Sequence, residues 1–292
     1  MDWPAISDAI SSAAHQPFKL TGHASTGGGC INQAWRIRGQ DSRQFFVKLN
    51  GADKLAMFAA EAAGLNEIAA TNTIRVPQPV VHGTANTHSF LVLEYLDLSN
   101  RGNAALLGEQ LAALHRCTQL RFGFAQDNFI GTTPQPNGWK NDWINFWREH
   151  RLGFQLRLTA QNGYGGKLQT LGEKLLDALP AFFASYLPQP ALLHGDLWSG
   201  NHAFLADGTP VIFDPAPYYG DRECDLAMTE LFGGYTAGFY TAYHAAYPLD
   251  AGYATRRDLY NLYHILNHAN LFGGGYARQA EQMMQKLLAE AG

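Results

Sequence analysis

The chain has 292 residues, of which 46% are hydrophobic and 16% are charged, a composition that supports a large core and excludes a disordered chain. Its formal net charge of −4 and the absence of a dense lysine or arginine run argue against a nucleic-acid partner. The sequence begins without the basic and apolar regions of a signal peptide and holds three scattered cysteines, so we expect a cytoplasmic protein with no membrane partner.

The N-terminal third of the chain has the pattern of a small sheet with one helix. Residues 53–71 are rich in alanine, leucine and glutamate, which is typical of a helix. Five short runs predict strands, at 18–26, 31–39, 44–50, 77–83 and 88–96. We therefore predict a five-stranded antiparallel sheet with one inserted helix.

Beyond residue 100 the pattern becomes helical. Apolar spacing predicts helices at 104–117, 142–163 and 167–186 and through most of 223–291, with Asp142 as the N-cap of the second. Two short apolar runs, 191–205 and 209–214, surround a polar loop. These elements predict an α+β fold of two lobes, a small N-terminal lobe at 1–96 and a larger, mainly helical lobe at 97–292.

A run of three glycines separates the first two predicted strands. Gly27, Gly28 and Gly29 allow the backbone to approach a ligand closely and to direct N–H groups at phosphate oxygens. A flexible hairpin turn explains the same composition. Cys30 follows directly, and neighbouring N–H groups arranged for an anion would favour its thiolate form.

Lys48 lies inside an apolar strand, and the helix that follows offers it a partner. Glu61 falls on the apolar stripe formed by Phe58, Leu65 and Ile68. A carboxylate in that position should be paired, because an unpaired buried charge is costly. A strand lysine paired with a helix glutamate behind a glycine-rich turn matches the clamp that holds ATP phosphates in protein kinases.

The strongest signal is the segment 194–201, HGDLWSGN, followed by a short strand that ends in Asp214. Asp196 and Asn201 are five residues apart, which equals the spacing of aspartate and asparagine in the kinase catalytic loop. Asp196 would accept the proton of the attacking hydroxyl. Asn201 and Asp214 would hold Mg²⁺ against the phosphates, because hard oxygen ligands suit that ion. The sequence therefore predicts a two-lobe, protein-kinase-like enzyme that uses ATP and Mg²⁺.

Over residues 18–290 the sequence resembles the fructosamine kinase (ketosamine 3-kinase) family, within the group of aminoglycoside phosphotransferases and choline kinases. The specific segments are DNFIGTTPQPN at 127–137 and YYGDRE at 218–223. The resemblance implies ATP-dependent phosphorylation of the 3-hydroxyl of ribulosamine, fructosamine or erythrulosamine adducts, free or on protein, as a deglycation reaction. It also implies that backbone groups of Glu94, Tyr95 and Leu96 meet the adenine.

Several residues remain open as substrate contacts. Asp221 and Glu223 can receive the amine of a ketosamine or, equally, begin the helix near residue 223, and Asp225 is better explained by a structural role. Asn137 lies in a turn-rich loop for which the resemblance suggests a substrate role. Trp198, inside the 194–201 segment, is a candidate to stack on the sugar.

Two alternative functions and one form of regulation also follow. The same fold serves kinases of aminoglycosides or amino alcohols, and a nucleotide-binding module without transfer is a further alternative. The resemblance implies redox control through Cys30, so we expect a monomer or a homodimer linked by this cysteine after oxidation.

Overall fold

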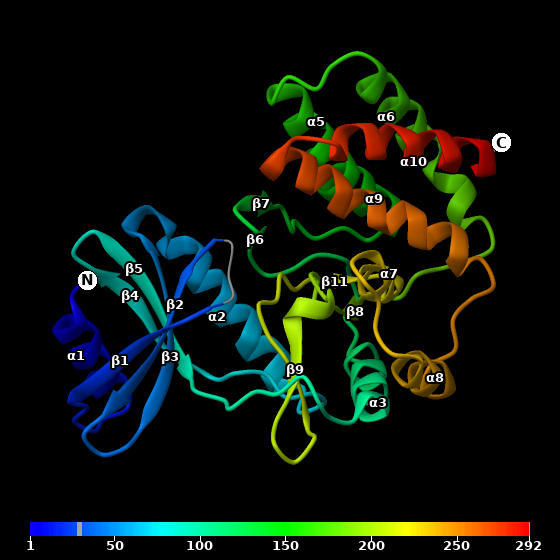
Figure 1. Ribbon diagram of the computed structural model, residues 1–292. Helices are drawn as coiled ribbons and strands as arrows, with labels where there is room; N and C mark the ends of the chain where they lie inside the picture. The colour runs from blue at the N-terminus through cyan, green and yellow to red at the C-terminus, as the bar shows by residue number, and fades with distance from the viewer. Residues whose placement is uncertain (28–30, 292) are drawn as a thin grey trace. The chain divides into compact units, whose positions relative to one another are not determined.

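The computed structural model describes residues 1–27 and 31–291, which fall into two compact units (Figure 1). The first unit combines Met1–Asn103 with Ala203–Pro215. The second combines Ala104–His202 with the described residues from Ala216 onward. None of the helices in the described residues is long and apolar enough to cross a membrane.

The segment 203–215 belongs to the first unit because it bonds there. Phe204 exchanges two backbone hydrogen bonds with Ser99, of 2.8 and 2.9 Å, and the amide of Ile212 donates to the carbonyl of Arg75 at 3.0 Å. The division of the chain therefore differs from the expected one after residue 96. The first unit extends to Asn103 and also includes a hairpin from much later in the sequence, β9 (His202–Phe204) with β10 (Pro210–Ile212).

The predicted five-stranded antiparallel sheet is confirmed in the first unit, where it carries the blue to cyan colours of Figure 1. Its strands are β1 (Leu20–Thr26), β2 (Gln33–Gly39), β3 (Gln44–Gly51), β4 (Pro79–Ala85) and β5 (His88–Glu94). They lie in the order β1-β2-β3-β5-β4, with every neighbouring pair antiparallel. The middle strand β3 therefore has hydrogen-bonded neighbours on both sides, and its Val47 and Leu49 are buried.

The predicted helix after β3 is also present, as α2 (Leu55–Ala70), preceded by a short 3-10 turn at Ala52–Lys54. It packs against β4 and β5. Phe58, Leu65 and Ile68 are its largest buried side chains, so the apolar stripe deduced from the sequence is the face that meets the sheet.

An additional helix, α1 (Trp3–Ala13), precedes the sheet and was not predicted. Asp2 caps it, because its carboxylate accepts a hydrogen bond of 3.1 Å from the amide of Ala5. Ile6 and Ile10, one turn apart, enter the core cluster that includes Phe18 and Val47. The signals for this helix were therefore an N-cap aspartate and one isoleucine pair.

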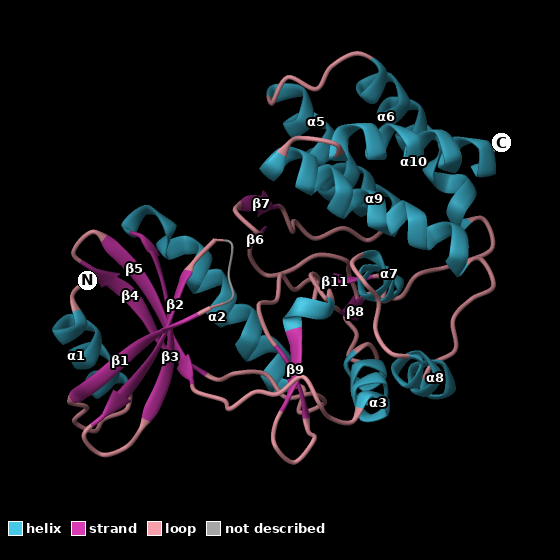
Figure 2. Cartoon of the chain, in the orientation of Figure 1, coloured by secondary structure: helices cyan, strands magenta, loops and turns pink. Residues whose placement is uncertain are grey.

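The second unit is mainly helical, as predicted (Figure 2). Its principal helices are α3 (Ala104–Leu114), α6 (Lys167–Ala178), α7 (Glu223–Leu231), α8 (Ala237–Ala246), α9 (Tyr253–Phe272) and α10 (Tyr276–Ala291). Helix α9 packs against α5, α7 and α10, and α3 packs against α8. Two short antiparallel pairs complete the unit, β6 (Asn128–Ile130) with β7 (Thr133–Gln135) and β8 (Ala191–Leu192) with β11 (Tyr219–Gly220).

The helix predicted at 142–163 is interrupted. It comprises α4 (Trp143–Trp147), a π-helical turn at Arg148–Leu152 and α5 (Gly153–Gln161). Asp142 is the N-cap, as predicted, with its carboxylate 2.7 Å from the amide of Asn145. A Cβ at Gly153 would lie 2.3 Å from the carbonyl oxygen of Arg148, so only glycine fits after the wide turn.

We predict that α1 is an integral part of the first unit. Ile10 is fully buried, so Ile10→Ala should lower the free energy of unfolding by about 2–5 kcal/mol, measured by urea denaturation. Asp8 lies on the exposed face of the same helix, and Asp8→Ala is the matched control. Equal stability of the two variants would show that α1 is not required for the core.

Candidate active site

In the first unit Lys48 is bonded to two carboxylates from distant parts of the chain. Its Nζ lies 2.6 Å from Oε1 of Glu61, on α2, and 2.5 Å from Oδ1 of Asp214, which follows β10. The predicted pairing of Lys48 with Glu61 is confirmed. That Asp214 also binds Lys48 was not predicted, because no local pattern connects residues so far apart.

Burial and charge act in opposite directions on this group. Lys48 is 5% exposed, and burial alone would lower its pKa, but the charges of Asp214 and Glu61 outweigh that effect and hold the pKa above its usual value. Burial raises the pKa of Glu61, an effect that the charge of Lys48 opposes. Lys48 is therefore a permanent cation inside the first unit.

Asp214 has an unusual backbone conformation and an accessible side chain. Its φ angle is +58°, in the left-handed region that few residues other than glycine adopt. Such strain persists only where the surroundings fix the residue, which the bond to Lys48 helps to do. The side chain of Asp214 is 45% exposed, so the carboxylate is held at one oxygen and available to other groups.

The end of β5 carries the three predicted adenine contacts. The carboxylate of Glu94 accepts bonds of 2.6 Å from Arg75 and from the amide of Gln78, so this side chain secures the strand end. The guanidinium of Arg36 lies over the ring of Tyr95, 4.6 Å from its centre, and Leu96 is half-buried.

Of the predicted glycine turn, only Gly27 lies within the described residues. It follows β1 directly, and a Cβ placed on it would meet nothing within 4 Å. The predictions for Gly28, Gly29 and Cys30 lie outside the part of the chain that the structure describes.

In the second unit, Asp225 of α7 fixes the 194–201 loop. Its two carboxylate oxygens accept hydrogen bonds from the backbone amides of His194, at 2.7 Å, and Gly195, at 2.8 Å. Gly195 has a φ of +83°, and a Cβ there would lie 2.0 Å from the carbonyl oxygen of Ala216, so the turn requires glycine. The structural role expected for Asp225 is thereby confirmed.

Asp225 is itself part of a buried network. Its Oδ2 lies 3.1 Å from Nε2 of His115, and Nδ1 of that ring lies 2.8 Å from the hydroxyl of Tyr243. Burial alone would raise the pKa of Asp225, but His115, His194 and the amide of Gly195 hold the pKa below its usual value. The loop is therefore anchored on an ionised carboxylate.

Asp196 and Asn201 are brought together by this loop. The amide nitrogen of the Asn201 side chain donates to the backbone carbonyl of Asp196 at 2.8 Å and lies 3.4 Å from Oδ2 of the same residue. The backbone amide of Asp196 donates to Nδ1 of His194 at 3.2 Å. Trp198 is 39% exposed, and a Cβ at Gly200 would lie 2.2 Å from its indole, so the ring lies over that glycine.

Asn137 lies directly after β7 and is fully buried. Its side chain donates to Oδ1 of Asn128 at 3.0 Å and accepts from Nη2 of Arg151 at 2.8 Å. Every contact of this side chain is therefore with the protein, and one partner, Arg151 of the π-helical turn, is a fully buried cation.

The same network supports the segment that follows Asp214. Asn128 donates to the carbonyl of Pro217 at 2.8 Å, and Gln135 donates to the carbonyl of Ala216 at 3.0 Å. The amide of Ala216 in turn donates to the carbonyl of His194 at 2.9 Å. The family-specific segment 127–137 thus holds the strand-like segment on which the 194–201 loop rests.

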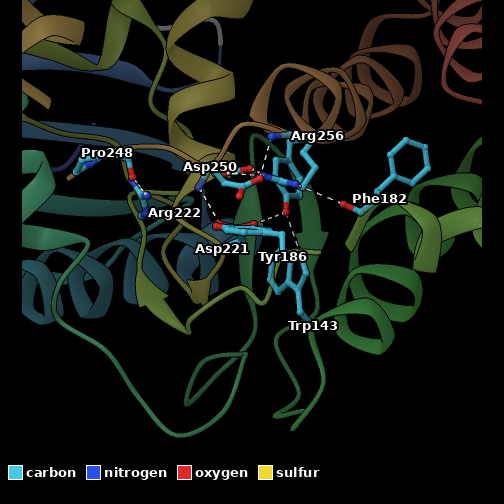
Figure 3. Close-up of polar contacts among 11 residues, drawn as sticks. Trp143, Phe182, Tyr186, Asp221, Arg222, Pro248, Asp250 and Arg256 are labelled. Atoms are coloured by element: carbon cyan, nitrogen blue, oxygen red, sulfur yellow. Dashed lines mark hydrogen bonds and ion pairs between the residues drawn. The ribbon is translucent and has the colours of Figure 1, made fainter. Parts of the chain in front are cut away.

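Asp221 and Glu223 lie in a buried cluster of charged and tyrosine side chains, drawn in Figure 3. The carboxylate of Asp221 accepts bonds from the hydroxyls of Tyr260, at 2.5 Å, and Tyr186, at 2.9 Å. Arg256 binds Glu223 through two nitrogens, at 2.7 and 3.0 Å. Both carboxylates are 0% exposed, so their placement favours a structural role over a contact with substrate.

Sequence reasoning did not identify His115, Arg151 or Arg256 as supports of the site. Arg151 and Arg256 lie in helical segments and His115 in the turn directly after α3, where the sequence pattern indicates only burial, and their partners are 110 (His115), 14 (Arg151) and 33 (Arg256) residues away. A charged or titratable residue at a buried helix position was the only available signal.

The buried cluster predicts a change of stability with pH. Burial raises the pKa of Glu223 from its ordinary 4.5 to about 7, so between these values the folded chain binds a proton that the unfolded chain releases. The stabilisation from this group is therefore fully present below 4.5 and is lost as pH rises to about 7.

Glu223→Gln cannot titrate, so urea denaturation at about pH 5 and about pH 7 should find that the stability of the variant relative to wild type increases with pH. Glu173→Gln, at an exposed position of α6, controls for the loss of one negative charge. A stability difference that stays constant over this range would contradict the assignment.

Comparisons with known proteins agree over nearly the whole chain. The family model for fructosamine kinase matches residues 2–290. A probable ketoamine kinase from Synechocystis is 49% identical over 98% of this chain and 97% of its own length. A chloroplastic protein-ribulosamine 3-kinase from Arabidopsis thaliana is 46% identical, over 92% of this chain and 83% of its own.

Solved structures give the same result for the fold. A protein from Haemophilus somnus described as a fructosamine-3-kinase has a TM-score of 0.89 and 30% identity, with 98% of this chain and 97% of that chain covered. A thermostable aminoglycoside phosphotransferase mutant has a TM-score of 0.60 at 14% identity, over 97% of this chain and 98% of its own, which shows the kinase-like fold alone. The chain belongs to the fructosamine kinase family.

Proposed function

We propose that this protein transfers the γ-phosphoryl group of ATP to the 3-hydroxyl of a ketosamine, free or attached to a protein. The observation that carries the proposal is the 194–201 loop, in which Asp196 and Asn201 are joined by a hydrogen bond and the backbone is fixed on the buried Asp225. The relatives named ketoamine kinase and ribulosamine 3-kinase support the choice of substrate.

Asp196 acts as the base in this reaction. Its carboxylate accepts the proton of the 3-hydroxyl as that oxygen bonds to the γ-phosphorus, while the bond from the γ-phosphorus to the bridging oxygen breaks and ADP leaves. Catalysis of this kind depends on position more than on covalent chemistry. Two hydrogen bonds serve that purpose: the backbone amide of Asp196 donates to Nδ1 of His194, and the side chain of Asn201 donates to the carbonyl of Asp196.

Lys48 binds the ATP phosphates. An ammonium group has three N–H donors, and Glu61 and Asp214 occupy two of them. The third is available for a phosphate oxygen, and the two carboxylates keep the nitrogen in place. Gly27, Gly28 and Gly29 are proposed to add backbone N–H donors to the same phosphates.

The adenine is proposed to meet the chain after β5. The Glu94 carboxylate is already engaged by Arg75 and Gln78, so the peptide groups of Glu94, Tyr95 and Leu96 are the recognition elements there. Their role requires an extended backbone, which the strand end provides.

Asp214 and Asn201 are the proposed Mg²⁺ ligands. Asp214 has an accessible carboxylate, one oxygen of which is bonded to Lys48. The side-chain nitrogen of Asn201 donates to the carbonyl of Asp196, so the side-chain oxygen of Asn201 can act as a metal ligand. Hard oxygen donors of this kind fit Mg²⁺. When bound, the ion would neutralise charge on the phosphates of ATP.

Trp198 is the substrate contact that we retain, because its indole is exposed next to Asp196 in the chain. A sugar ring stacks on such a surface through its C–H face. Asn137, Asp221 and Glu223 are fully buried and bonded within the protein, and we assign them to positioning and stability instead. The cytoplasm remains the predicted location.

The reaction and its base are tested together by phosphate transfer from ATP to ribuloselysine, fructoselysine, a glycated protein and kanamycin. We expect transfer to the ketosamines, and a decrease of at least about 100-fold with Asp196→Asn, since the base is lost. ATP binding, measured by calorimetry, should be nearly unchanged in the variant.

Kanamycin as the only acceptor would overturn the proposed substrate class while leaving phosphoryl transfer intact. Wild-type turnover in Asp196→Asn would overturn the base. ATP binding without transfer to any acceptor would instead favour a nucleotide-binding module.

We also propose redox control through Cys30, on the sequence and the family resemblance alone. Peroxide treatment should convert wild type to a disulfide-linked dimer of lower activity, seen on a non-reducing gel and reversed by a thiol. Cys30→Ala should remain monomeric, and Cys117→Ala, at a half-buried cysteine of the second unit, is the control. The same amount of dimer in Cys30→Ala and wild type would exclude this cysteine.

A further inference from the structure

A cavity of about 190 Å³ lies in the second unit, lined by Tyr186, Leu187, Gln189, Ala191, Arg222 and Tyr247. None of these residues belongs to the 194–201 loop or to the groups assigned to ATP. An engineered protein cavity of about 150 Å³ holds a benzene molecule, so this cavity has room for one small organic ring. Arg222 is the only charged residue among those that line it.

Arg222 is a buried cation without an ion pair among the described residues. It is 8% exposed, and its guanidinium donates to the hydroxyl of Tyr243 at 3.0 Å and to the carbonyls of Tyr247 and Pro248 at 3.0 and 2.5 Å. Figure 3 shows it reaching toward Pro248. All three acceptors are neutral, and two of the five N–H donors of the guanidinium have no acceptor in the described protein.

The nearby carboxylates lie close enough for Arg222 to act on the charge of Glu223, but neither is hydrogen-bonded to Arg222. Glu223 is bound at both oxygens by Arg256, and Asp221 is bound by Tyr186 and Tyr260. Arg256 illustrates the contrast, because it has two carboxylate partners, Glu223 and Asp250. A buried guanidinium that lines a cavity and has no hydrogen-bonded carboxylate can accept an anionic ligand at its unused donors.

The other walls of the cavity indicate what the anion is attached to. Tyr247 stacks on Arg222, with the guanidinium 3.7 Å from the ring centre, and Arg116 lies 4.8 Å from the same centre. Tyr186 contributes a second ring to the lining, and Arg256 lies over that ring at 3.8 Å. The hydroxyl of Tyr186 donates its hydrogen bond to Asp221 and so does not serve as a donor to a ligand. Leu187 is 81% exposed and lies at the open side. Aromatic and aliphatic surfaces around one cation match a carboxylate on a small apolar body better than a bare inorganic ion.

We propose that this cavity is a binding site for a small organic carboxylate. Its two oxygens accept the unused N–H donors of Arg222, and the exposed amide of Gln189 offers a further donor. Its apolar body lies against Tyr186, Tyr247 and Leu187. Binding there does not depend on the proposed kinase activity, because the lining residues take no part in phosphate transfer.

Benzoate is the probe for this site, measured by calorimetry on the full chain, with benzamide as its neutral counterpart of the same shape. We expect benzoate to bind and benzamide to bind about 10- to 100-fold more weakly, which is the range expected when hydrogen bonds to a charged group are lost. Arg222→Gln should weaken benzoate binding by a similar factor.

Leu187→Trp provides a second variant that leaves the Arg222 hydrogen bonds intact, because residue 187 is exposed and a larger side chain there fills the cavity. It should also weaken benzoate binding about tenfold or more. Leu120→Trp is the matched control, since Leu120 is 96% exposed and does not line the cavity.

Three results would overturn the proposal: no benzoate binding to wild type, equal binding of benzoate and benzamide, or equal benzoate binding by the Leu187 and Leu120 variants. Tighter binding of inorganic phosphate than of benzoate, lost with Arg222→Gln, would replace the carboxylate with a phosphate ligand and so overturn it as well. Because turnover is not measured, failure of the proposed kinase function leaves this test unaffected.

Discussion

The first unit depends on the need to neutralise one buried charge. Lys48 is inside the sheet, and it is stable there only because Glu61 and Asp214 surround its ammonium group. These carboxylates come from α2 and from the 203–215 segment, so the ion pairs bind a late part of the chain to an early one. The backbone bonds of Phe204 to Ser99 and of Ile212 to Arg75 reinforce that arrangement. Removing either carboxylate would leave a buried charge underpaired, which costs about 3–5 kcal/mol in comparable cases.

The second unit also contains a buried charge that needs partners, and there the charge is an anion. Asp225 is buried and ionised, and it uses its charge to hold two consecutive amides, those of His194 and Gly195. Bonds to a charged acceptor are stronger than neutral ones, so the backbone before Asp196 is held firmly at a point where the chain turns through a positive φ. The same carboxylate contacts His115, whose ring lies within hydrogen-bond distance of the Tyr243 hydroxyl. Arg222 donates a hydrogen bond to that hydroxyl. One buried hydrogen-bond network therefore joins the 194–201 loop to α8 and to the end of α3.

The spacing of apolar and charged residues along the sequence was enough to predict the helices and strands that are defined by neighbouring residues. The periodic spacing of apolar residues predicted the sheet and the helix that contains Glu61. The pairing of Glu61 with Lys48 followed because a carboxylate on the apolar face of a helix needs a cationic partner. Helix α1 was missed because its buried apolar pattern is limited to one pair, Ile6 and Ile10. The inclusion of Ala203–Pro215 in the first unit was also not predicted, since it depends on the pairing of Ser99 with Phe204, over a hundred residues apart. The burial of Asp221 and Glu223 is beyond local pattern too, because their partners, Tyr260 for Asp221 and Arg256 for Glu223, lie more than thirty residues away.

The segment 127–137 shows why a family-specific motif need not mark a substrate contact. Asn137, Asn128 and Gln135 are buried, and their side-chain amides bond to each other, to the carbonyls of Ala216 and Pro217, and to neighbouring protein groups that include Arg151 and Tyr263. Each amide has both donors and acceptors, so one replacement leaves a partner unsatisfied, and a buried unsatisfied group costs about 1–3 kcal/mol. Such a network tolerates few substitutions whatever the substrate is. In this chain the segment therefore supports the backbone between Asp214 and α7, which accounts for its buried amides without a contact to substrate.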